Sequence, residues 1–93
     1  MSDEINVLVI DSNLSLAEAW AEGLRRLGFT RCSVAGPDIP IDELAALKPA
    51  LTVLGSSLDA QTCTRCVHKL KIISPFMPVL TSCYGVLLGE GPE

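Results

Sequence analysis

The residue pair best suited to chemistry is Cys63 and Cys66, which form a CxxC motif followed by His68. Such a pair can act as a redox dithiol or supply half of a zinc site. A c-type haem attachment is excluded, because His68 does not directly follow Cys66. The two cysteines also share an apolar stripe with Leu70 along an expected helix over residues 59–73. Core packing, redox chemistry and metal binding are thus alternative predictions, and the stripe favours packing.

A second group of polar residues follows two short apolar runs. Asp11 and Ser12 follow the run over residues 5–10, and Gly55 follows the run over residues 49–54. Apolar runs of this length without polar alternation are typical of strands buried on both faces of a parallel sheet. Ligands gather where such strands end. The sequence therefore predicts a site shared by these two strand ends, with no charge at position 55.

Asp11 and the serines also have plainer interpretations. Asp11 suits the N-cap of the following helix or a partner for that helix's dipole, and this structural role is favoured. Ser56 and Ser57 could donate hydrogen bonds to an anion near a helix start, although loop serines are more often simply solvated.

Amphipathic segments alternate with the apolar runs. In the first of them, Leu16, Trp20, Leu24 and Leu27 recur about one helical turn apart, which predicts that this face packs on the core. Alternating strands and amphipathic helices predict a right-handed, doubly wound parallel sheet. The expected strands cover residues 5–10, 29–35, 49–54 and 77–83, and the expected helices cover residues 14–27, 38–47 and 59–73.

Size and composition limit the class of protein. The 93 residues make one domain at most, and 48% hydrophobic with 19% charged residues is a globular composition. A net charge of −4 without basic clusters argues against nucleic-acid binding. The apolar runs are too short to cross a bilayer, which takes about 20 residues. Without a basic and then apolar leader, the expected location is the cytoplasm with reduced thiols.

Four segments, in this order and spacing, resemble the receiver domain of response regulators in two-component signalling, over residues 5 to 83. They are Val7-Leu8-Val9-Ile10-Asp11-Ser12-Asn13, Leu27-Gly28-Phe29, Lys48-Pro49-Ala50-Leu51-Thr52-Val53-Leu54 and Met77-Pro78-Val79-Leu80-Thr81-Ser82. The resemblance implies a CheY-like, flavodoxin-like α/β fold with strand order 2-1-3-4. Receivers have five strands and five helices, so about four strands and three helices imply a truncated version. The implied domain covers residues 1–83, and residues 84–93 form a short tail or the start of a missing segment.

The resemblance also implies a degenerate phosphorylation site. A working receiver carries an acid pair after the first strand, an acceptor aspartate after the third, a Ser or Thr after the fourth and a lysine after the fifth. Here Asp11 matches one acid, Ser12 stands at or beside the other, and Gly55 falls on the acceptor position. The hydroxyl position maps to Ser82 or Cys83, and no fifth strand with its lysine can be placed. Asp11 alone is a weak candidate for divalent-cation binding, and no cofactor is expected.

The resemblance thus implies a pseudo-receiver, not an enzyme, which regulates through protein contacts. It would dimerise or control the output domain of a transcription regulator, and it is also similar to the atypical receiver of flagellar sigma-54-dependent regulators. Self-association is expected on the side of the fourth strand, where apolar surface and an open edge would be left. Two alternatives stay open: a small dithiol redox protein using Cys63 and Cys66, and an active receiver with Asp59 as a displaced acceptor.

Overall fold

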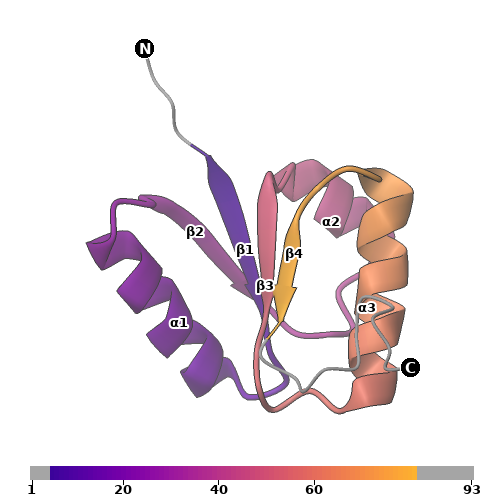
Figure 1. The fold of residues 1–93 in the computed structure, drawn as a ribbon, viewed down its shortest axis with the longest axis horizontal. Helices are drawn as coiled ribbons and strands as arrows, with labels where there is room; N and C mark the ends of the chain where they lie inside the picture. The colour runs from indigo at the N-terminus through magenta and orange to yellow at the C-terminus, as the bar shows by residue number, and fades with distance from the viewer. Residues whose placement is uncertain (1–4, 82–93) are drawn as a thin grey trace, which may run out of the picture.

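The computed structural model describes residues 5–81, and these form a parallel sheet with helices on both faces (Figure 1). The strand order is β2-β1-β3-β4, with every pair parallel. This flavodoxin-like, doubly wound topology confirms the predicted fold class and order. The elements in the described part are β1 (Asn6–Ile10), α1 (Leu14–Arg26), β2 (Arg31–Ala35), α2 (Ile41–Leu47), β3 (Leu51–Leu54), α3 (Ala60–Ile73) and β4 (Val79–Thr81).

The strands are buried on both faces because helices cover both. Leu8 and Ile10 point to the face covered by α2 and α3, whose core contribution includes Leu44 and Leu70. The intervening residues of β1 point to the opposite face, which α1 is the one described helix to cover. The continuous apolar runs that predicted buried parallel strands are explained by this three-layer arrangement.

The core-facing side of α1 differs from the prediction. Ala17 and Ala21 are fully buried against the sheet, whereas Leu16 and Trp20 are each 40% exposed and Leu27 is 76% exposed. The predicted core stripe was therefore wrong for these three residues. Alanines bring the helix axis close to the sheet, and at 100° per residue the larger apolar side chains lie on the neighbouring flank.

Helix boundaries follow local chemistry. Asn13 caps α1, since its side chain accepts hydrogen bonds from the backbone N–H groups of Ser15 and Leu16 at 3.0 and 3.3 Å. Gly28, with φ +113°, follows the C-cap residue Leu27 of α1. The expected helix over residues 38–47 begins later than predicted, because Pro40 occupies the N-cap of α2, without a side-chain hydrogen bond, and Asp38 lies before the helix.

The half of the sheet that α1 does not reach is partly open. Leu80 pairs with Val53 across β3 and β4, so it lies on the α1 face, where it is 55% exposed. Within residues 5–81, no strand pairs with the outer edge of β4. At the opposite edge, β2 is half-exposed. Ser82, Cys83 and the expected tail over 84–93 lie outside the described residues. Among the helices that are described, none has the length and apolar character needed to cross a bilayer.

The burial pattern predicts unequal costs for two leucine truncations on helices. Leu70→Ala removes a fully buried side chain and should lower the free energy of unfolding by about 2–5 kcal/mol. Leu16→Ala removes a partly exposed one and should change it by less than about 1 kcal/mol. Urea unfolding of both variants at low protein concentration checks this, and equal costs would show that the Leu16 flank belongs to the core.

Candidate functional site

Asp11 and Gly55 lie side by side at the carboxyl edge of the sheet. β1 pairs with β3 so that Ile10 is opposite Leu54, and the next residue of each strand continues the pairing. The N–H of Gly55 donates to the carbonyl of Ile10 at 2.8 Å, and the N–H of Asp11 donates to the carbonyl of Ala35 at 3.1 Å. The backbone ladder therefore fixes both residues, as expected for two strands that end at one edge.

The Asp11 carboxylate is fully buried and held by the loops around it. Its Oδ1 accepts a hydrogen bond from the N–H of Asn13 at 2.9 Å and another from the hydroxyl of Ser57. Its Oδ2 is buried and has no hydrogen-bond partner among the residues that the structure describes. Of the two structural roles expected for Asp11, that of helix cap was wrong, because Asn13 caps α1 and Asp11 instead accepts the backbone N–H of Asn13.

The side-chain space at position 55 is filled by Asp11. A Cβ placed on Gly55 would overlap the Asp11 carboxylate and would lie 2.9 Å from the Cβ of Asp11. Gly55 is itself buried, so the added atom has no free direction. Glycine is required at position 55 because the Asp11 side chain approaches its backbone so closely. The sequence places a glycine at position 55, but it did not reveal that the Asp11 carboxylate occupies the space that a side chain there would need.

Ser12 and Ser57 close the outside of this arrangement. The two hydroxyls are 3.2 Å apart, and the Ser12 hydroxyl donates to the Ser57 carbonyl at 3.3 Å. Both residues are exposed. They link the loop after β1 to the loop after β3, and Ser57 connects that link to the buried carboxylate.

The oxygen atoms of this site do not suit Mg²⁺, the ion that the receiver resemblance implies. Mg²⁺ requires near-octahedral oxygen coordination, usually with one or two carboxylates and other anionic oxygens. Asp11 is the one carboxylate in the arrangement just described, and its unpartnered Oδ2 is directed at Gly55 rather than outward. Across residues 5–81 there is no group of three or more His, Cys, Asp or Glu side chains placed to hold a metal ion.

Asp59, the alternative acceptor, caps α3. Its Oδ1 accepts a hydrogen bond from the N–H of Thr62 at 2.8 Å. This bond, together with the Thr62 side chain, lowers the pKa of the Asp59 carboxyl. The stabilisation is therefore present above the ordinary aspartate pKa and is lost as the pH falls through the lowered value. The side chain is exposed and already serves the helix terminus.

Cys63 and Cys66 both lie inside the core formed with α2 and the sheet. The Cys66 thiol is directed to the carbonyl of Pro37 at 4.0 Å. Burial raises the pKa of this thiol, although nearby Lys69 and Arg65 act in the opposite direction. A raised pKa reduces the thiolate fraction, which is the reactive form. His68 is exposed and is separated from the core that holds the two thiols.

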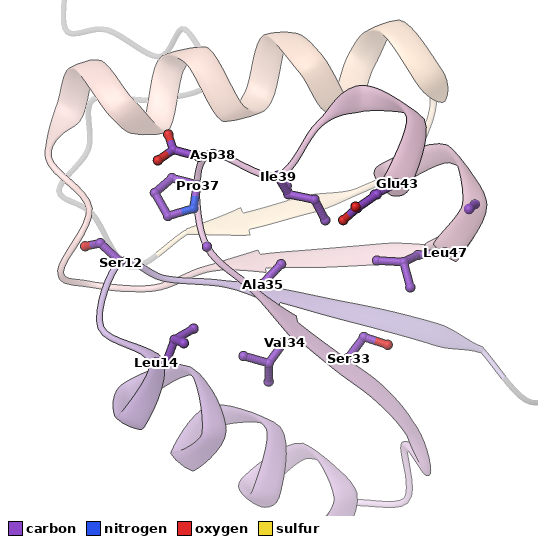
Figure 2. A pocket seen from close by; sticks show the side chains of 12 residues that line it. Ser12, Leu14, Ser33, Val34, Ala35, Pro37, Asp38, Ile39, Glu43 and Leu47 are labelled. Carbon is purple, nitrogen blue, oxygen red and sulfur yellow. The ribbon is translucent and has the colours of Figure 1, made fainter.

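A large hollow lies beside this site, along the edge of β2. It has a volume of about 1090 Å³ and is lined by the loop after β1, the first residue of α1, β2 and the loop that follows it, and α2 (Figure 2). Its charged members are both acids, Asp38 and Glu43, and Ser12 lies at one end. Neither Asp11 nor Gly55 lines it. The hollow is therefore a surface groove beside the strand ends and not a cavity above them.

Comparisons with protein-family models, with curated proteins and with solved structures gave no match.

The shared space predicts a steric penalty at position 55. Gly55→Ala should lower the free energy of unfolding by about 1–3 kcal/mol, because Asp11 must leave its position. Gly36→Ala is the matched control and should have little effect, since a Cβ there meets nothing within 4 Å. Chemical unfolding measures both.

A double-mutant cycle assigns that penalty to Asp11. In an Asp11→Ala background the carboxylate is gone, so Gly55→Ala should cost clearly less than it does in the wild type. An undiminished cost would contradict the packing described for the two residues.

Thiol accessibility is a separate prediction. In a Cys32→Ser/Cys83→Ser variant, Cys63 and Cys66 are the remaining thiols, and both should react slowly with a disulfide reagent until the protein is unfolded. The rate should rise with pH well above neutrality, since the pKa of Cys66 is raised. Fast reaction of both thiols at neutral pH would instead support the dithiol redox alternative.

Proposed function

We propose that this chain is a pseudo-receiver: a receiver-like regulatory domain that takes no phosphoryl group and acts through protein contacts. One observation carries the proposal. The Asp11 carboxylate fills the space that an acceptor side chain at position 55 would need. The position thus lacks an acceptor group, and no room is left for one.

The fold supports the same interpretation. The sheet order β2-β1-β3-β4 with helices on both faces is CheY-like, and Asp11 and Gly55 stand at the strand ends where receivers carry their chemistry. Ser12 replaces the second acid and engages Ser57. The Asp11 carboxylate accepts hydrogen bonds from Asn13 and Ser57. The arrangement is therefore suited to holding the loops after β1 and β3 in place.

The two rival functions have less support from the geometry. Asp59 is committed to the N-cap of α3, which disfavours the displaced acceptor. Cys63 and Cys66 are buried in the core, and a redox dithiol needs a reactive, accessible thiolate. Burial of both cysteines favours the packing interpretation over the redox one.

Regulation without a phosphoryl group has to act through surfaces. Large apolar side chains are exposed on α1 and β4, and patches of this kind mark protein contacts. The partners we propose are a second copy of the chain and the output domain of a transcription regulator, in the cytoplasm. The acidic net charge disfavours direct nucleic-acid contact.

Phosphoryl donors and their mimics test the proposal. Incubation with acetyl phosphate and Mg²⁺ should leave the intact mass unchanged, and beryllofluoride with Mg²⁺ should leave Trp20 fluorescence unchanged. A phosphorylatable receiver treated in parallel is the positive control. A stable phosphoryl adduct, or a saturable fluorescence change, would refute the pseudo-receiver.

A further inference from the structure

The hollow of about 1090 Å³ along β2 lies on the free edge of the sheet, and we call it the β2 groove. Its floor is β2 itself, from Ser33 to Ala35. Leu14 of α1 lies on one side of the strand, and Ile39 and Leu47, at the two ends of α2, lie on the other (Figure 2). The groove therefore has a wall from each helix layer and a strand edge between them.

The hydrogen bonds of β2 show which of its backbone groups face the groove. The carbonyl of Ala35 accepts from the N–H of Asp11 at 3.1 Å, so in this parallel pairing Ala35 and every second residue before it bond to β1. Cys32 and Val34 direct their backbone groups the other way. The Cys32 carbonyl is already taken by the Arg25 guanidinium at 3.3 Å. Val34 presents both its N–H and its C=O to the groove, and within residues 5–81 no strand pairs with this edge.

We propose that the β2 groove binds an extended peptide segment of a partner protein, which adds to the sheet as a strand beside β2. Val34 is half-buried, and half-buried backbone groups are stabilised by a partner that supplies an acceptor and a donor at strand spacing. A second copy of the chain fits less well. It presents its own β2 between the same two walls, so the walls of the two copies would meet before the strands could pair.

The two walls differ in chemistry, which specifies the side chains of the peptide. Toward α1 the groove is apolar, with Leu14 and Val34. Toward α2 it carries Asp38 and Glu43, which are exposed and are the charged residues in its lining. Side chains of a strand point alternately to its two faces. The matching segment therefore alternates apolar residues, directed to α1, with Lys or Arg, directed to the acids.

The two acids are available to a basic partner. Asp38 and Glu43 form no salt bridge within the described residues. Lys69 lies outside the lining of the groove, and its ammonium donates to the carbonyls of Pro37 and Ile39 at 3.1 and 2.9 Å. The net charge of −4 adds a longer-range attraction for a basic segment.

This inference rests on the proposed function in one respect, since it supplies one of the protein contacts through which a pseudo-receiver would act. The two can fail separately. A phosphoryl adduct would refute the pseudo-receiver and leave peptide binding in place, whereas a groove that binds no peptide would leave the phosphorylation result unchanged.

A peptide titration followed by ¹H–¹⁵N spectra of the full chain tests the site. The probe is a capped peptide of about six residues, a common strand length, that alternates valine with lysine. We expect saturable shifts at the amides of Val34 and Glu43, and no shift at Leu80 on the other open edge of the sheet. The same peptide with glutamate in place of lysine should not bind. An absence of saturable shifts, or shifts at Leu80 instead of Val34, would overturn the proposal.

Charge variants test the acidic wall. Glu43→Gln should weaken binding of the valine–lysine peptide about two- to fivefold at low salt, and the difference from wild type should shrink as salt is added. Glu18→Gln is the matched control, because it removes the same charge from an exposed position that does not line the groove. Equal weakening by both variants would show attraction to the net charge alone and would contradict the site.

Methylation of alternate peptide nitrogens tests strand pairing itself. In an antiparallel strand, the residue opposite Val34 exchanges both hydrogen bonds with it and points its side chain to the same wall. That residue is a valine of the probe, so N-methylated valines should weaken binding on the order of tenfold or more, while N-methylated lysines should be tolerated. A parallel strand gives the reverse pattern. Equal effects of the two methylations would show that the peptide does not pair with β2, and would overturn the proposal.

A dilution series of the free protein tests the competing occupant. The Val34 amide signal should not change with protein concentration when no peptide is present. A concentration-dependent shift at Val34 would show that a second copy occupies the groove, and it would overturn the assignment to a peptide segment.

Discussion

The structure depends on one spatial constraint: the Asp11 carboxylate and the side chain of residue 55 cannot occupy the same place. Parallel pairing of β1 with β3 fixes the two backbones, so neither residue can move away without breaking the ladder. Glycine at position 55 resolves the conflict and leaves a fully buried carboxylate held by Asn13 and Ser57. Burying such a group costs free energy unless donors compensate, and the loops after β1 and β3 supply two donors to Oδ1.

In a doubly wound sheet, chemistry usually takes place at the carboxyl ends of the strands. Here the residues at those ends pack on each other and connect two loops. The carboxyl edge still brings two loops together, but the interactions across it link those loops to each other. Ser12 and Ser57 bond across the outside, and Asp11 bonds beneath them. An edge organised in this way holds its two loops together, as the proposed pseudo-receiver requires.

Much of the fold could be predicted from the sequence, because continuous apolar runs and alternating helices leave few topologies. The carboxyl-edge location of Asp11 and Gly55 followed from the same rule. The orientation of α1 could not be predicted, because periodicity ranks large apolar residues above Ala17 and Ala21, while close packing on a sheet favours small ones. The contact between Asp11 and Gly55 was also beyond reach, since it depends on a side-chain position that no spacing in the sequence records.

Exposed apolar side chains on α1 and β4 and the packed carboxyl edge with Asp11 and Gly55 are two distinct features of the domain. The claim on which this account depends is that the packing of Asp11 against Gly55 does not change when Mg²⁺ and a phosphoryl mimic are added. The most direct measurement is a ¹H–¹⁵N spectrum during titration with Mg²⁺ and then beryllofluoride, following the amides of Asn13, Gly55 and Ser57. We predict that these three amide signals stay in place through both additions. Saturable shifts at these amides would contradict the account.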